Sequence, residues 1–339
     1  MAEWDVEKHD IVIVGAGMAG LTAARTLQDM GYDAVVLEKS RGLGGRCATR
    51  RIGAGIFDHG AQFFTVREPA FQEVVDQWLA RGTAREWTRG FPTLDGITER
   101  PSHPRYYGVE GMTGLAKSLA EGLDVRREHR VKRVTEARGH WIVELDGGGR
   151  MHAGILALTA PVPQSLRLIN DENTWRFGAL LSPLLTIHYS PCVAAMALLD
   201  GPSGIPEPGA ARVDEGPVAW IADNQRKGVS PGAVAVTIHA SQAWSRGHLA
   251  DDPQESARVL AEAAQPMLEG RITEVRGHRW RYSVPSSTLP RGFYFLDCRA
   301  PLYFAGDAFG GNRIEGAVLS GMALARSVAG LVEKKEVGR

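Results

Sequence analysis

The chain has 339 residues, of which 44% are hydrophobic and 23% charged, and its 39 basic and 39 acidic residues cancel to a net charge of zero. A chain of this length buries a large core and is expected to form more than one domain. Zero net charge gives no overall field that attracts nucleic acid or an anionic membrane, so neither is a predicted partner. The three cysteines give no disulfide framework, and their odd number favours a reducing compartment.

Three features of the sequence predict a cytoplasmic location. Residues 1–10 carry four acidic side chains and lack the apolar core of a secretory signal. The glycine motif that begins at Gly15 leaves no room for a transit peptide before it. No run reaches the roughly 18 uninterrupted apolar residues that indicate a transmembrane helix.

The first motif is a strand, a glycine turn, a helix and a second strand. Residues 11–14 form a β-branched run, residues 15–20 fit G-x-G-x-x-G, and an apolar strand over 34–37 ends on Glu38. In such a unit Gly15 permits the tight turn, Gly17 lets a pyrophosphate approach the backbone, and Gly20 allows close packing of helix on strand, while Glu38 accepts from a ribose hydroxyl. This pattern predicts binding of an adenine dinucleotide.

Two further segments identify that dinucleotide as a flavin. A second glycine cluster over residues 40–46 follows Glu38 directly, and NAD-binding domains need no such cluster; Arg46 at its end suits a phosphate because its guanidinium is a planar fork of donors. Near the C-terminus, an apolar strand over 302–304 leads to Asp307, which suits a ribityl hydroxyl. The helix that opens at residues 313–317 is expected to face the flavin edge where negative charge accumulates.

These motifs together resemble the flavin-dependent amine oxidase superfamily and, within it, the renalase-like NAD/FAD-dependent oxidoreductases. The superfamily marks are Gly15, Gly17, Gly20, Glu38, Gly44, Gly45, Arg46, Asp58, Gly60, Gly306, Asp307, Gly316, Ala317, Ser320 and Gly321. The renalase-like marks lie at residues 39–42, 60–65, 239–245 and 278–282. The resemblance covers nearly the whole chain, from about residue 10 to about residue 331.

The resemblance implies an α/β fold, α+β overall, in which a Rossmann-type FAD-binding domain carries a second, antiparallel-sheet substrate domain. The FAD-binding domain is predicted to be discontinuous and to comprise residues 5–66, 105–162 and 290–335. The substrate domain is predicted to comprise residues 67–104 and 163–289.

Periodicity and turn residues predict the elements along the rest of the chain. Helices are expected over residues 71–79 and 253–268, and a further helix is expected to begin with the stretch 108–115. Strands are expected over 125–133, 141–145, 155–158, 193–199, 218–222 and 234–240, and loops over 89–104 and 201–209.

By resemblance, FAD is expected to be bound without a covalent bond, because Cys298 lacks the local context of a flavin-linking cysteine. The implied cofactor-binding residues are Gly15, Ala16, Gly17, Met18, Ala19, Gly20, Glu38, Lys39, Arg41, Gly45, Arg46, Gly60, Ala61, Gln62, Phe63, Val131, Ala160, Gly306, Asp307, Arg313, Ile314, Glu315 and Ala317. No His/Cys cluster has the spacing of a zinc site, so no metal is predicted.

Candidate substrate-orienting residues are aromatic side chains at strand ends. Trp220, Trp280 and His239 are the predicted catalytic group, with Trp244 nearby; each also has an ordinary reading as a core or hydrogen-bonded residue. The pair Arg226 and Lys227 is interpreted as a solvated turn, with a phosphate-binding role as the alternative.

The resemblance implies an FAD-dependent oxidase that oxidises a dihydronicotinamide isomer, 2- or 6-dihydro-NAD(P), to NAD(P)+, with O2 giving H2O2. An amine oxidase acting on a small amine is the alternative of the same class. That branch typically has a lysine beside the flavin, and no lysine lies between Lys132 and Lys227 or between Lys227 and Lys334. A flavin-binding sensor without turnover is the alternative of a different class.

Overall fold

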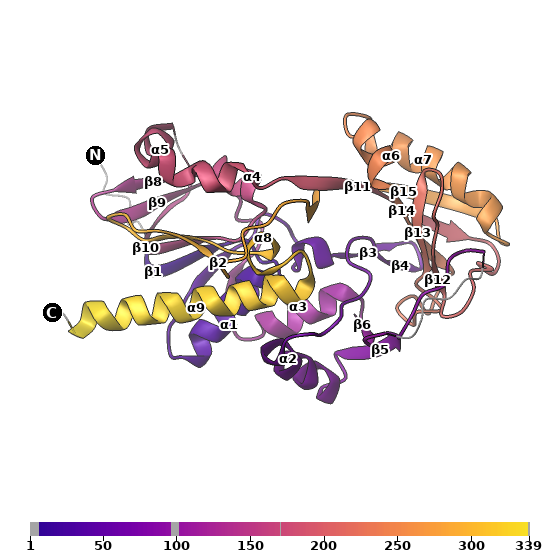
Figure 1. The fold of residues 1–339 in the computed structure, drawn as a ribbon, viewed down its shortest axis with the longest axis horizontal. Coiled ribbons are helices and arrows are strands. Elements are labelled where there is room, and N and C mark those ends of the chain that lie inside the picture. The colour runs from indigo at the N-terminus through magenta and orange to yellow at the C-terminus, as the bar shows by residue number, and fades with distance from the viewer. Residues whose placement is uncertain (1–6, 96–101, 170, 338–339) are drawn as a thin grey trace. The chain divides into compact units, whose positions relative to one another are not determined.

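The computed structural model describes residues 7–95, 102–169 and 171–337, and the chain divides into two compact units (Figure 1). Unit 1 comprises residues 1–45, 116–188 and 285–339, and unit 2 comprises residues 46–115 and 189–284. By this division the segments 46–66 and 105–115, which the sequence assigns to the FAD-binding domain, belong to unit 2. Their assignment to FAD binding stays a prediction.

Unit 1 is built on an eight-stranded sheet whose centre is parallel. Its strands run in the order β16 (Tyr294–Leu296), β17 (Leu302–Phe304), β10 (Arg150–Leu158), β1 (Glu7–Val14), β2 (Val35–Leu37) and β7 (Asp124–Arg126). In addition, β9 (His140–Leu145) pairs with β10, and β8 (Val131–Ala137) pairs with β9. The strand β1 pairs in parallel with both β10 and β2, through Val12 opposite Leu156 and Val35. Parallel strands of this kind are buried on both faces, and the central residues of β1 are fully buried accordingly.

Helices cover this sheet. They are α1 (Met18–Asp29), α4 (Val162–Leu166), α5 (Asp171–Leu185), α8 (Asp307–Gly310) and α9 (Ile314–Val337); α3 (Met112–Ala120) and the short 3-10 turn Gly45–Cys47 span the division between the units. In Figure 1, α1 and α9 lie side by side. Their backbones approach so closely that a Cβ added at Gly321 of α9 would lie 2.3 Å from the carbonyl oxygen of Ala19.

The length and hydropathy of α9 would suit a membrane-spanning helix, and half of that stretch is buried inside the protein. Val318, Leu324, Ala325 and Val328 are fully buried. The apolar composition of α9 is therefore accounted for by its packing in unit 1.

Unit 2 is built on a five-stranded sheet. Its strands run in the order β12 (Ala210–Arg212), β13 (Val218–Asp223), β14 (Ala235–Ala240), β11 (Tyr189–Leu199) and β15 (Ile272–Pro285). The hairpins β3 (Thr49–Ile52) with β4 (Gly55–Asp58) and β5 (Ala84–Thr88) with β6 (Arg105–Gly108), the helices α2 (Pro69–Ala80), α6 (Gln242–Gly247) and α7 (Pro253–Ala264), and the 3-10 turn Gln265–Met267 complete the unit. The pairs β12–β13, β13–β14 and β14–β11 are antiparallel.

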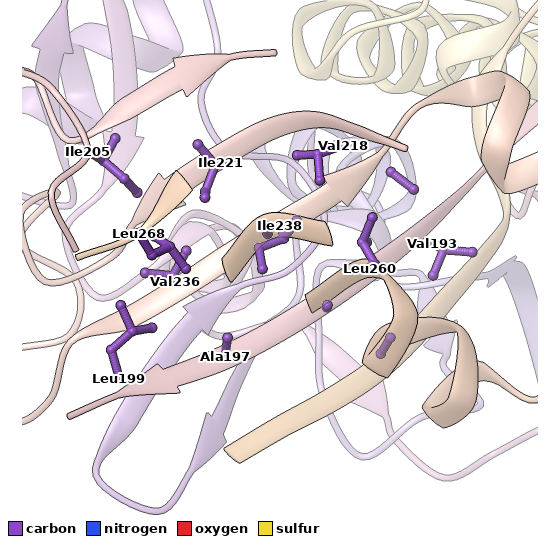
Figure 2. Packing of buried hydrophobic residues seen from close by; sticks show 14 of the residues in the cluster. Val193, Ala197, Leu199, Ile205, Val218, Ile221, Val236, Ile238, Leu260 and Leu268 are labelled. Atoms are coloured by element: carbon purple, nitrogen blue, oxygen red, sulfur yellow. The ribbon is translucent and has the colours of Figure 1, made fainter. Parts of the chain in front are cut away.

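The two faces of this sheet differ in chemistry because side chains alternate along each strand. One face, with Val236 and Ile238 of β14, packs against Leu260 of α7 in a purely apolar cluster (Figure 2). The other face carries Thr237 and His239 and lies against the end of β4. The chemistry that the sequence predicts for this unit therefore concentrates on one face.

The predicted fold class is confirmed, since a Rossmann-like parallel sheet is combined with a separate antiparallel sheet. Most predicted elements agree within a few residues. The strand predicted over 125–133 is wrong, because β7 ends at Arg126 and a turn with Glu128 at φ +60° separates it from β8. The helix predicted over 253–268 ends at Ala264. Residues 96–101 of the loop predicted over 89–104 lie outside the described residues.

The close contact between α1 and α9 generates a stability prediction. Gly321→Ala places a methyl group against the α1 backbone and should lower the free energy of unfolding by about 1–3 kcal/mol. Gly330→Ala in the same helix meets nothing within 4 Å and should raise it by about 0.5–1 kcal/mol. Urea unfolding of both variants at the same excess of FAD measures the difference; equal stabilities would contradict the packing.

Candidate functional site

The glycine turn of unit 1 is shaped by two close backbone contacts. Gly15 has φ +112°, and a Cβ there would lie 2.8 Å from Thr159 Oγ1. A Cβ at Gly20 would lie 2.0 Å from the carbonyl oxygen of Gly15. The Thr159 hydroxyl donates to the carbonyls of Val14 and Gly15, both at 3.0 Å. Neither glycine can therefore be replaced without moving the backbone.

Gly17, between them, has open space: a Cβ there would meet nothing within 4 Å. Gly17 is the N-cap of α1, it offers no side-chain cap, and the first turn of α1 holds no acidic residue. The first N–H groups of the helix therefore receive no side-chain cap from Gly17, and they lie at the positive end of the helix dipole. Such an end is a binding site for a phosphate.

The carboxylate of Glu38, at the end of β2, is buried beside this turn. Its Oε2 accepts from the Ala16 N–H at 3.0 Å and its Oε1 from the Ser40 N–H at 2.7 Å. The second glycine cluster reaches the same place, because the Gly44 N–H donates to the Ala16 carbonyl at 2.8 Å. Unit 1 thus brings together both glycine clusters and the acidic residue that the sequence predicts for one dinucleotide.

The C-terminal motif follows β17 in the same unit. Gly306 has φ +145°, and its N–H donates to Ser320 Oγ of α9 at 2.8 Å. The buried Asp307 begins α8, and the buried Glu315 lies in the first turn of α9. A Cβ at Gly310 would lie 2.0 Å from the Gly316 carbonyl, so the end of α8 and the start of α9 are packed backbone on backbone.

The remaining predicted cofactor residues of unit 1 have varied exposures. Met18 and Ala19 are buried in α1, Val131 is buried in β8, Ile314 and Ala317 are partly buried in α9, Ala160 is partly buried after β10, and Lys39, Arg41, Gly45 and Arg313 are exposed.

Unit 2 carries the other predicted cofactor residues, which are Arg46 and four residues of the segment Asp58–Phe63 that begins at the end of β4. The Ala61 N–H donates to the Arg46 carbonyl at 2.9 Å. A Cβ at Gly60 would lie 2.1 Å from that same carbonyl, so only glycine fits. The guanidinium of Arg46 donates to the Ser283 carbonyl at 3.1 Å and lies over the ring of Tyr189.

Two of the three predicted catalytic residues meet at one atom of this segment. The carbonyl oxygen of His59 accepts from Trp280 Nε1 at 2.8 Å and from His239 Nε2 at 3.1 Å. The imidazole of His59 stacks on the Trp280 indole with ring centroids 5.1 Å apart, and His278 packs against both rings. Neither His59 nor His278 was predicted as a site residue, although His59 lies between the marks Asp58 and Gly60 and His278 begins the motif 278–282.

All three histidines of this cluster are held neutral at physiological pH. Burial lowers the pKa of His59 to about 3, and the charges of Arg50 and, in acid, of protonated His278 add to the effect. Burial also lowers the pKa of His239 to about 4, although its hydrogen bond to the His59 carbonyl acts in the opposite direction. Burial and the charge of Arg50 lower the pKa of His278 to about 4. Among the described residues no group of three or more His, Cys, Asp or Glu side chains could hold a metal ion.

The other predicted aromatic residues lie in different clusters. Trp220 lies cross-strand from His239, and its ring packs edge-to-face on Phe91 at 4.7 Å. Trp244 lies in α6, whose N-cap is Ser241, and its ring stacks on that of His248 just after the helix, with ring centroids 3.9 Å apart.

The interpretation of Arg226 and Lys227 as a solvated turn is wrong for the lysine. The side chain of Lys227 is completely buried, and its Nζ lies 2.7 Å from Asp58 Oδ2. Only Arg226 reaches the surface, where it pairs with Glu207. Sequence spacing gave no sign of this, because Asp58 precedes Lys227 by 169 residues.

Comparisons with known proteins agree with this geometry. The sequence profile of NAD(P)-binding Rossmann-like domains matches residues 13–78, and that of flavin containing amine oxidoreductases matches residues 91–329. The chain is 24% identical to renalase of Mus musculus over 336 residues, which cover 93% of this chain and 97% of renalase.

Solved structures show the same fold. Putrescine oxidase bound to putrescine is 15% identical to this chain with a TM-score of 0.70, and the match covers 96% of this chain and 100% of that one. A fatty acid isomerase from P. acnes is 14% identical with a TM-score of 0.70, and the match covers 94% of this chain and 98% of that one.

The glycine turn predicts opposite effects of two similar substitutions. Gly17→Ala adds a methyl group in open space, at φ −81°, so the free energy of unfolding of the apoprotein should change by no more than about 0.5 kcal/mol. The same methyl group obstructs the approach of a pyrophosphate and should raise the Kd for FAD about tenfold or more. A tenfold change corresponds to about 1.4 kcal/mol of binding free energy. Gly20→Ala should instead destabilise the apoprotein. Urea unfolding and fluorescence titration with FAD separate the two effects; an unchanged FAD affinity in Gly17→Ala would refute the pyrophosphate site.

The neutral histidine cluster predicts a loss of stability in acid. Above pH 6.5 neither the folded nor the unfolded chain protonates His59, so its contribution is fully present. As the pH falls from 6.5 toward the folded pKa of about 3, only the unfolded chain takes up the proton, so stability declines by at most about 1.4 kcal/mol per pH unit for this histidine. His59→Phe should therefore show a shallower decline between pH 6 and pH 4 in urea unfolding. Parallel curves for variant and wild type would contradict the shifted pKa.

Proposed function

The chain belongs to the family of flavin containing amine oxidoreductases, and on this premise we propose that it is an FAD-dependent oxidase whose electron donor is a dihydronicotinamide nucleotide. The overall reaction converts a 2- or 6-dihydro-NAD(P) isomer, O2 and one proton to NAD(P)+ and H2O2. When bound, FAD would supply the hydride acceptor and the two-electron exchange with O2. The chain's own residues bind the cofactor, orient the donor and set the charge of the donor's surroundings.

The residues that would hold FAD fit that group. The open space at Gly17 and the free N-terminus of α1 suit the pyrophosphate, and Glu38 at the end of β2 suits the ribose. In unit 2, Gln62 is buried, and its Oε1 finds no hydrogen-bond partner among the described residues. A buried acceptor of this kind is expected where a ligand completes the hydrogen bonding.

The observation that carries the proposal is the low basicity of the histidine cluster. With pKa values of about 3 to 4, His59, His239 and His278 are poor proton acceptors at neutral pH. An amine is an ammonium ion at neutral pH and must lose a proton before its C–H bond yields a hydride. A dihydronicotinamide loses a hydride alone, and therefore needs no base.

The lysine of unit 2 does not supply the missing base. Its ammonium donates to Asp58 Oδ2 at 2.7 Å and to the Gln62 carbonyl at 2.6 Å. An ammonium held in this way has no lone pair with which to accept a proton. Neither the three histidines nor Lys227 therefore offers the amine oxidase alternative a base on this face.

Charge near the histidine cluster also favours a nucleotide over an amine. Arg50, exposed on β3, is close enough to depress the pKa of both His59 and His278. The positive charge of Arg50 attracts phosphate and repels an ammonium ion. The aromatic wall of His59 and Trp280 presents flat rings to a neutral dihydropyridine, which would be oriented by stacking.

The test is anaerobic rapid mixing of the FAD-loaded protein with candidate donors, followed by the loss of flavin absorbance. The 2- and 6-dihydro-NAD(P) isomers should bleach the flavin faster than putrescine, other polyamines or catecholamines. Because no protein base takes part, the rate constant should be nearly constant from pH 6 to pH 9.

A pair of variants tests the orienting wall. Trp280→Ala should slow bleaching by the dihydronicotinamide about 100-fold through misplacement of the ring. Trp280→Phe keeps an aromatic face, loses only the hydrogen bond to the His59 carbonyl, and should retain most of the rate. Faster bleaching by an amine would favour amine oxidation, and bleaching by no donor would favour a flavin-binding sensor without turnover.

A further inference from the structure

Lys227 has no role in the reaction proposed above, although it is the most unusual charged residue of unit 2. It lies four residues beyond the end of β13, and its side chain and that of Asp58 are both fully buried. Besides donating to Asp58 and to the Gln62 carbonyl, its ammonium lies over the rings of Trp87 at 4.8 Å and Tyr107 at 5.7 Å. Oxygen acceptors and aromatic faces therefore surround the charge.

The two oxygen acceptors are the two ends of one short segment. Asp58 begins the segment and Gln62 ends it, so a single ammonium ties the first residue to the last. The second carboxylate oxygen of Asp58 accepts from Thr49 Oγ1 at 2.6 Å and from the Met112 N–H at 2.7 Å. Asp58 is thus anchored independently, and Lys227 closes the segment onto that anchor.

The middle of the segment is the part that meets the aromatic wall. The His59 carbonyl receives Trp280 and His239, and the His59 ring stacks on Trp280. Gly60 and Ala61 are held against the Arg46 carbonyl. A shift at either end of the segment would therefore move the His59 ring and the residues that the sequence predicts to contact FAD.

Burying an ion pair is a costly way to stabilise a fold. Both ions lose their hydration, and apolar residues of similar size often serve stability equally well. Burial lowers the pKa of Lys227, and the neighbouring Asp58 opposes that shift. Beyond stability, the pair fixes the positions of Asp58 and Gln62 relative to each other, because one ammonium donates to an oxygen of each residue.

We propose that Lys227 is a positioning residue, which clamps the segment Asp58–Gln62 and thereby sets the environment and reactivity of the bound flavin. The inference rests on the FAD cofactor of the proposed function but not on the identity of the electron donor. It is distinct from a catalytic role, since the fully buried ammonium donates to Asp58 and to the Gln62 carbonyl, neither of which is a reacting group.

The test is a double-mutant cycle of Lys227→Met, Asp58→Asn and the double variant, with exposed Lys132→Met as the matched control. Two donor-free properties are measured on the FAD-loaded proteins: the visible circular dichroism of the flavin and its midpoint potential. Urea unfolding is measured in parallel. Both flavin properties are measured without a substrate. If no dihydronicotinamide reduced the flavin of the wild-type protein, the proposed electron donor would be wrong, but this test of Lys227 would still apply.

If Lys227 and Asp58 act as one clamp, each single variant and the double variant should show the same altered dichroism and potential, so the effects do not add. Stability should follow a different pattern: Lys227→Met leaves a buried carboxylate without its counterion and should be the least stable, and the double variant should recover much of that loss. Lys132→Met should match the wild type throughout.

Three results would overturn the proposal. The first is wild-type dichroism and potential in the double variant, which would reduce the pair to a structural contact. The second is additive effects of the two single substitutions, which would show that the residues act separately. The third is a Lys227→Met protein with unchanged flavin properties. Where Lys227→Met alone fails to fold, the comparison of the double variant with Asp58→Asn decides, because these two should then be alike.

Discussion

The carboxylate of Asp58 is the charge around which unit 2 is organised. A carboxylate removed from water must be compensated by donors, and this one has three: the Lys227 ammonium, the Thr49 hydroxyl and the Met112 N–H. These donors come from segments on both sides of Asp58 in the chain. The main chain of Asp58 is held as well, because its N–H donates to Asn224 and its carbonyl accepts from Thr237. One buried charge therefore joins β3, β4, the start of α3, β14 and the loop after β13.

The five-stranded sheet makes this arrangement possible because its faces are chemically separate. The face under α7 carries a large apolar cluster, which supplies hydrophobic stabilisation. The opposite face is free to carry Thr237, His239 and Trp280, each with a hydrogen bond to the segment after β4. The small side chain of Ala194 on β11, cross-strand from His239, is fully buried and leaves room for the imidazole of His239. The apolar cluster and the hydrogen bonds to the segment after β4 thus lie on different faces of one sheet.

The parts of the fold that depend on local sequence were predictable, and those that depend on distant partners were not. The glycine turn, β1, α1 and Glu38 lie within one short stretch, and each residue type there has a single physical reason. The run from β7 to β8 was taken for one strand because alternation continues through Glu128, and a positive φ there has no signature in the sequence. The long strand β15 was identified only as a segment with two aromatic residues.

Candidate site residues divide in the same way. Trp280 and His239 were selected from the motifs in which they lie, and the structure brings them to the same carbonyl oxygen. Lys227 was misread because a basic pair before a glycine is usually solvated, and the carboxylate that removes it from solvent is encoded 169 residues earlier. No local pattern distinguishes a buried lysine from an exposed one, since burial is decided by the partner.

The neutral histidines bear on the second half of the proposed reaction as well as the first. Forming H2O2 from O2 requires one proton beyond the hydride that the donor supplies. At neutral pH almost no protonated form of His59, His239 or His278 is present, because burial lowers the pKa of all three. The charge of Arg50 adds to this effect at His59 and His278, and that of Lys227 at His239. The Lys227 ammonium is committed to Asp58 and Gln62. The described groups of this face are therefore poor proton donors at that pH, and water is the simplest source of the proton. A face without a titrating group in the neutral range would then neither take a proton from the donor nor supply one to oxygen, which is the behaviour that a hydride-only oxidation requires.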